Sequence, residues 1–114
     1  MVHQSLRAAR DLEAGGIGTV VANVHTIKPL DEKEIVKLVS ACGAAVVAEE
    51  HQQAGGLGGA IAEVLARQRP TPLEFVGLPD TFGESGAPAD LIERYGMGVA
   101  HVTEAVRRII KRAR

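Results

Sequence analysis

Apolar positions along the chain alternate between helical spacing and short β-branched runs, with glycine and proline between them. Residues 2–14 carry apolar side chains at helical spacing, and Gly15-Gly16 predicts the end of that helix. The apolar face of this predicted helix consists of Val2, Leu6, Ala9 and Leu12. The run 18–24 is almost continuously apolar, which is typical of a central parallel strand buried on both faces. We therefore expect a helix followed at once by a buried strand.

The remainder of the chain continues this alternation. Asp31 and Glu34 stand at the spacing of a helix capping box, and Gly43 predicts the end of the helix that they begin. The expected core-facing side chains of that helix are Ile35, Leu38, Val39 and Cys42. Two further strands are predicted at 45–50 and 73–78, and further helices at about 57–69, 88–95 and 102–111.

Alternating helices and strands predict an α/β fold with a mainly parallel sheet. Three strands are few for an open sheet, and the first helix has no strand before it. A β-α-β unit needs a strand there, because its helix crosses over from one strand to the next. We therefore expect the fold to be incomplete at its N-terminus.

Composition narrows the possible functions. A chain of 114 residues fits one domain, spanning 1–114. A net charge of −1 and only 3% aromatic residues argue against a nucleic-acid partner. The single cysteine excludes an internal disulfide and argues against a zinc site. No apolar run approaches the length that crosses a bilayer, so we expect a cytoplasmic protein with no membrane partner.

The strongest candidate for a catalytic or ligand-binding site is Glu49-Glu50-His51, at the carboxyl end of a predicted parallel strand. Ligands of open α/β sheets bind at that edge. Strand alternation places Glu49 and His51 on one side, where a carboxylate beside an imidazole suits acid–base chemistry. The alternative is that these side chains satisfy loop amides or contact a neighbouring subunit. No catalytic residue and no metal ligand is assigned from this pattern.

A glycine-rich turn follows, in which Gly55, Gly56 and Gly58 open a helix. Helix N-termini attract anions, and glycine lets a ligand approach the backbone closely. The spacing matches neither a dinucleotide fingerprint nor a phosphate-binding P-loop, so a tight packing turn is the alternative. The possible loop, interface or anion site therefore comprises Glu50, His51, Gly55, Gly56 and Gly58. The basic tail from Arg107 to Arg114 suits phosphate contacts or a solvated helix face.

Four motifs in order resemble the C-terminal domain of transketolase. They are T-I-K-P-L-D at 26–31, V-A-E-E-H with G-G-L-G at 47–51 and 55–58, G-L-P-D-T-F-G-E-S-G at 77–86 and L-I-E-R-Y-G at 91–96. Deoxyxylulose-phosphate synthase shares K-P-L-D and the E-E-H and G-G parts of the second motif, but its third loop usually departs from F-G-E-S-G. The alternatives are that synthase's C-terminal domain or a stand-alone small-molecule-binding, anion-binding or regulatory α/β module.

This resemblance implies a three-layer α/β/α domain of a thiamine-diphosphate-dependent ketol transferase of sugar-phosphate metabolism, in the pentose phosphate pathway. In that family, thiamine diphosphate and magnesium bind other domains, so this chain is expected to bind no cofactor and to be inactive alone. The C-terminal domain mainly supports a dimer. The expected partners are a second copy and the remaining transketolase domains or subunit.

The resemblance also places the missing strand. In the family's C-terminal domain, the strand before the first helix lies between the strands that correspond to 19–24 and 45–50. Without it, either these two strands close together or each exposes an apolar edge. Bare edges pair with other chains, so we expect self-association through the family's dimer surface or by strand exchange.

Overall fold

The computed structural model describes residues 1–113 and contains five helices and two strands within that range. In chain order the elements are α1 (Val2–Ala14), α2 (Glu32–Cys42), β1 (Ala45–Gln52), α3 (Leu57–Gln68), β2 (Leu73–Leu78), α4 (Pro88–Arg94) and α5 (Val99–Ala113). Among these helices, none is long and apolar enough to cross a membrane.

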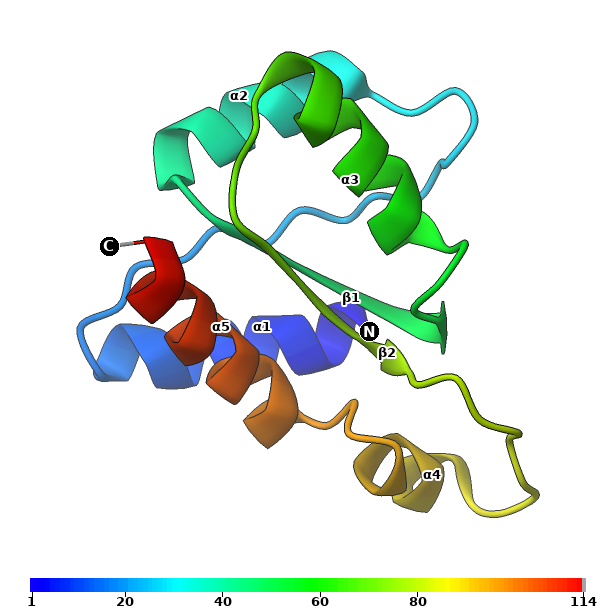
Figure 1. Ribbon diagram of the computed structural model, residues 1–114. Helices are drawn as coiled ribbons and strands as arrows, with labels where there is room; N and C mark the ends of the chain where they lie inside the picture. Colours follow the sequence, from blue (N-terminus) through cyan, green and yellow to red (C-terminus); the bar gives the residue numbers. More distant parts are fainter. Residues whose placement is uncertain (114) are drawn as a thin grey trace.

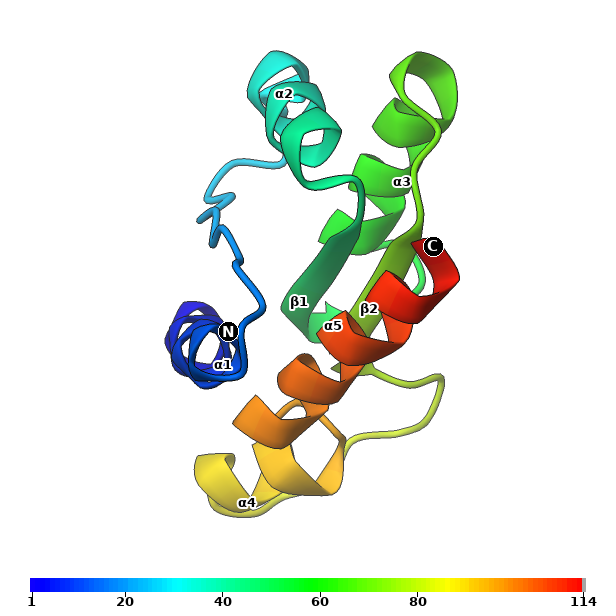
Figure 2. The same cartoon turned by 90° about the vertical axis from the view of Figure 1, so that its left-hand side faces the viewer.

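The elements form three layers, which confirms the expected α/β/α architecture. Strands β1 and β2 pair in parallel, α2 and α3 cover one face of the sheet, and α1 and α5 cover the other (Figures 1 and 2). One buried cluster joins β1 to α2 and α3 through Ile35, Val39, Val47, Ile61 and Leu65. A second joins β2 to α1 and α5 through Ala8, Val76, Met97, Val102 and Ala105. Each face of the sheet therefore has its own apolar core.

The helix ends follow the local signals in the sequence. The Asp31 carboxylate accepts a hydrogen bond from the Glu34 amide at 3.1 Å, and Gly43 ends α2 with a φ of +79°. The second half of the capping box is replaced, because the Glu34 carboxylate accepts from Lys37 instead. Helix α5 begins at Val99, three residues before the predicted start.

The predicted strand at 18–24 is wrong. These residues run beside the sheet without forming a strand, and Val20 is 63% exposed. In Figure 2 this segment lies on the side of β1 away from β2, between α1 and α2. A strand is defined by its hydrogen-bonded neighbour, and within residues 1–113 β1 pairs only with β2. Sequence pattern specifies an apolar extended segment but cannot supply the neighbour.

Two predicted helix faces are also corrected. Cys42 is exposed rather than buried in the core. On α1 the buried residues are Ala8 and Leu12, while Val2 and Leu6 are 42% and 48% exposed. Cys42 and Val2 both line the open space between residues 18–24 and β1. The sequence analysis left open whether the strands on either side of this space close together or expose their edges, and the exposure of Cys42 and Val2 follows from the open space between them.

Strand β1 is irregular near its carboxyl end. Ala48 pairs with Val76, and the next paired residue, Gln52, lies opposite Leu78. Residues 49–51 therefore bulge opposite the single residue Gly77. A Cβ at Gly77 would lie 2.9 Å from the carbonyl oxygen of His51, so this glycine admits the bulge. The bulge therefore lies in residues 49–51, the segment that the sequence predicts as a candidate site, and it interrupts the regular alternation of their side chains.

Candidate functional site

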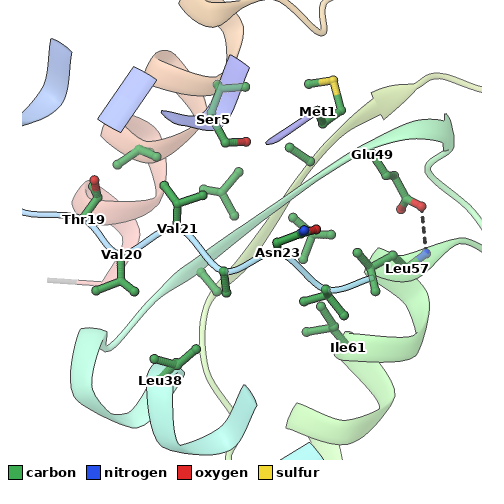
Figure 3. A pocket seen from close by; sticks show the side chains of 18 of the residues that line it. Met1, Ser5, Thr19, Val20, Val21, Asn23, Leu38, Glu49, Leu57 and Ile61 are labelled. Atoms are coloured by element: carbon green, nitrogen blue, oxygen red, sulfur yellow. Dashed lines mark hydrogen bonds between the residues drawn. The ribbon is translucent and has the colours of Figure 1, made fainter. Parts of the chain in front are cut away.

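The N-terminus of α3 is capped by a carboxylate from β1. The Oε2 atom of Glu49 accepts from the amide of Leu57 at 2.8 Å, and Oε1 accepts from the amide of Gly58 at 2.9 Å (Figure 3). Residue Gly56, at the N-cap position, has no side chain to do this. Two of the free amides of α3 are therefore satisfied by a negative charge, which also suits the positive end of the helix dipole.

The glycines of the turn make room for this contact. A Cβ on Gly56 would lie 2.2 Å from Oε2 of Glu49, and a Cβ on Gly58 would lie 2.2 Å from the Phe75 ring. Gly55 has a φ of +79°, in the left-handed region that favours glycine. These three positions therefore let the carboxylate and the aromatic ring pack directly against the backbone at the start of α3.

The other predicted site residues lie away from this contact. Glu50 and His51 are exposed, and Nδ1 of His51 lies 2.8 Å from the carbonyl oxygen of Gln52. No hydrogen bond or ion pair joins Glu49 to His51 in the described part of the chain, because the bulge interrupts the alternation that would place them together. Of the two interpretations of Glu49, the geometry favours the one in which it satisfies loop amides.

Sequence reasoning missed the glutamines that follow. The Gln52 side-chain amide donates to the carbonyl of Thr81, and Gln53 donates to the carbonyl of Gly77, both at 3.2 Å. These bonds tie the loop after β1 to β2 and to the loop that follows it. A polar residue directly after a strand was the only available signal, and it does not identify a partner 24 to 29 residues away.

A groove of about 640 Å³ opens between residues 18–24 and β1. Figure 3 shows Val21 and Asn23 along one side and Glu49 at one end. Its apolar lining comes from both helical layers and includes Ala9 and Leu12 from α1, Leu38 and Cys42 from α2, and Val106 and Ile110 from α5. The groove therefore occupies the sheet layer itself rather than the outer surface of the molecule.

The remaining candidate residues have structural contacts. Arg108 and Arg112 of the basic tail bind the Glu74 carboxylate on β2 at 2.8 and 3.4 Å. Arg114, also part of that tail, lies outside the described residues. No three His, Cys, Asp or Glu side chains gather as metal ligands within residues 1–113. The loop 79–87 carries Phe82, which is 97% exposed.

Known proteins with similar sequences and structures share one family. The profile of the family described as transketolase, C-terminal domain, matches residues 1–102. The chain is 41% identical over 112 residues to the 6-deoxy-6-sulfo-D-fructose transketolase subunit SqwH of Clostridium sp. (strain MSTE9), a match that covers 98% of this chain and 35% of that subunit. It is 40% identical over 104 residues to the 1-deoxy-D-xylulose-5-phosphate synthase of Desulforudis audaxviator (strain MP104C), covering 90% of this chain and 16% of the synthase.

Among solved structures, the chain is similar to a split gene transketolase described as an inactive beta4 tetramer. The two share 42% identity with a TM-score of 0.94, and the match covers 99% of this chain and 37% of the other. The chain thus spans only about a third of the SqwH subunit and of this tetramer's chain.

Proposed function

Because the chain belongs to the transketolase family and corresponds to its C-terminal domain, we propose that it is an assembly domain of a thiamine-diphosphate-dependent ketol transferase. In this proposal it carries no catalytic residue and is inactive alone. The observation that carries it is the Glu49 carboxylate on the amides of Leu57 and Gly58. The edge where open α/β sheets usually bind ligands is thus occupied here by a contact that stabilises the start of α3.

The described residues do not fit thiamine diphosphate and magnesium. A diphosphate at the N-terminus of α3 would meet the Glu49 carboxylate, which already accepts from two of the amides there. The groove beside it is lined mainly by apolar side chains, which do not suit a diphosphate–magnesium pair. We therefore assign cofactor binding to other domains of the complete enzyme.

The proposed partners are those remaining domains or a separate subunit that contains them, together with further copies of this chain. Support comes from the similar structure, which is described as a split gene enzyme and a tetramer. The fully exposed loop 79–87, with Phe82 at its surface, offers a contact surface outside the groove. A cytoplasmic setting, as expected from the composition, belongs to the same proposal.

Calorimetry tests whether this chain binds the cofactor. Titration of the chain with thiamine diphosphate and magnesium is expected to give no saturable heat, and a transketolase assay of the chain alone should give no turnover. A stoichiometric site tighter than about 100 μM, roughly −5.5 kcal/mol, contradicts the proposed division of roles. Titration of a complete transketolase under identical conditions is the positive control.

The sugar chemistry of the complete enzyme has two candidates. The pentose-phosphate reaction of transketolase is the first, and the F-G-E-S-G sequence at 82–86 favours it. The second is deoxyxylulose-phosphate synthesis, which the 40% identity to a synthase supports. Assays of the complete enzyme with a ketose phosphate donor, and with pyruvate plus an aldose phosphate, distinguish the two reactions.

A further inference from the structure

The segment 79–90, which joins β2 to the first turn of α4, is exposed along its whole length and carries Phe82. Phe82 is 97% exposed, whereas the ring of Phe75 packs beside Gly58 at the start of α3. In Figure 1 the segment and α4 lie at one end of the molecule, beyond the end of β2. Segment 79–90 belongs to neither buried cluster, so it presents a large aromatic side chain to solvent without contributing to the core.

Hydrogen bonds from other elements hold the backbone around Phe82. The side-chain amide of Gln52, at the end of β1, donates to the carbonyl of Thr81 at 3.2 Å. The hydroxyl of Tyr95, the C-cap residue of α4, donates to the carbonyl of Phe82 at 3.4 Å. These bonds engage the backbone and leave the Phe82 ring outside the fold. Because an ordered loop loses less conformational freedom on binding, this arrangement suits an anchor side chain that a partner buries.

The charges around Phe82 indicate the kind of partner. Segment 79–90 contains Asp80, Glu84 and Asp90 and no basic residue. Glu84 pairs with Arg94 at 2.9 Å, and within residues 1–113 no ion pair engages either aspartate. A two-fold contact between copies of this segment would bring like charges together, which is unfavourable. The charges therefore favour a different chain with basic side chains at its surface.

We propose that Phe82 anchors an interface with a separate protein subunit, whose surface offers an apolar pocket bordered by lysine or arginine. Resting on the proposed function, this partner is the subunit that carries the thiamine-diphosphate-binding domain of the complete enzyme. The Phe82 ring fills the pocket, which removes about 200 Å² of its surface from water, and Asp80 and Asp90 face the basic border. This interface is distinct from the groove between residues 18–24 and β1.

Surface plasmon resonance tests the role of Phe82. The chain is immobilised at low density, and the separately expressed subunit of its source organism with the thiamine-diphosphate-binding domain is the analyte. Phe82→Ala is expected to raise Kd at least about 30-fold, mainly through faster dissociation. Its melting temperature should match that of the parent, because the side chain is 97% exposed. Val20→Ala is the matched control, since it trims an exposed apolar side chain in the groove, and it should leave Kd within about twofold.

The same measurement tests the acidic side chains. Asp80→Asn combined with Asp90→Asn is expected to lower the association rate about tenfold at low salt and to flatten its salt dependence, because both carboxylates attract the basic border. The matched control is Asp11→Asn combined with Glu13→Gln, which removes two exposed negative charges from α1. The control should leave the association rate within about twofold of the parent.

Three results overturn the proposal. If the parent binds the subunit and Phe82→Ala binds equally well, Phe82 is not the anchor, and the proposed assembly function stands. If the parent does not bind the subunit, both the interface and the assembly function are wrong. If Phe82→Ala instead converts a self-associated chain to monomer in light scattering, the segment 79–90 binds a second copy and not a separate subunit.

Discussion

At the scale of single residues, Gly56 decides whether the start of α3 can form. We expect Gly56→Val to lower the free energy of unfolding by about 2 kcal/mol and the melting temperature by about 8 °C. The new Cβ would displace the Glu49 carboxylate, which cannot retreat without losing its bonds to the amides of Leu57 and Gly58. Thermal unfolding followed by circular dichroism measures this effect.

Gly59→Val is the matched control, because a Cβ at Gly59 meets no atom within 4 Å. It adds the same side chain to the same turn of helix, so its melting temperature should stay well above that of Gly56→Val. If the two variants melt together and Gly56→Val alone loses measurable sulfate binding, the glycine turn is an anion site and not a packing site.

A second prediction at the scale of single residues concerns the negative charge of Glu49. We expect Glu49→Gln to cost about 1–2 kcal/mol, because the amide side chain keeps one acceptor oxygen and loses the negative charge at the positive end of α3. Chemical denaturation provides the measurement. Glu50→Gln changes the same charge one residue away on an exposed side chain, and it should stay within about 0.5 kcal/mol of the parent. Equal losses in both variants would refute a specific role for Glu49.

At the scale of secondary-structure elements, ion pairs of Glu74 join β2 to α5. The Glu74 side chain is 16% exposed and binds both Arg108 and Arg112. Glu74→Gln is expected to cost about 1 kcal/mol, and the loss should shrink in high salt because both arginines are more than half exposed. Urea denaturation at two salt concentrations measures it.

Glu104→Gln is the control for Glu74→Gln, because Glu104 also faces Arg108 but at 3.9 Å and on an exposed helix surface. Its effect should stay below about 0.5 kcal/mol. An effect as large as that of Glu74→Gln would mean that general charge balance, and not the contact between β2 and α5, stabilises the helix.

The elements also show what sequence can predict here. Helix ends depend on residues within one turn, so Asp31, Gly43 and the Gly15-Gly16 pair placed them correctly. Strand formation depends on a neighbour far away in the chain, so an identical kind of apolar run became β1 at 45–52 but no strand at 18–24. The same dependence on a distant neighbour explains Cys42. Its position on α2 was predicted correctly, but the side chain is exposed because residues 18–24 do not form a strand.

The candidate site was predictable only in its position. The segment 49–51 does lie at the carboxyl end of a parallel strand beside a glycine-rich helix start. Its chemistry depended on a bulge that is set by Gly77 on the other strand, and no pattern within 45–52 reveals that bulge. A helix start whose N-cap is glycine was the available signal that a carboxylate from elsewhere would serve α3.

For the molecule as a whole, helices cover both faces of the sheet, but within residues 1–113 no third strand pairs with either edge, and the edge of β1 also borders the apolar groove. Helix cover protects apolar faces from water, but it does not satisfy the N–H and C=O groups along an edge. The outer edge of β1 and the apolar groove beside it are therefore the part of this chain most exposed to pairing with another polypeptide. Association of the isolated chain follows from this asymmetry.

We expect the isolated chain to self-associate at micromolar concentration, with a light-scattering mass of at least twice its 12.0 kDa. Val20→Lys should shift the population towards monomer, because Val20 lines the groove, is 63% exposed and belongs to neither buried cluster. Phe82→Lys removes an apolar side chain that is even more exposed, at 97%, from the loop 79–87, away from the groove, and should leave association through the groove edge intact. A stable, monodisperse parent monomer would contradict the prediction and mean either that residues 18–24 pair with β1 in solution or that the missing strand does not belong between them.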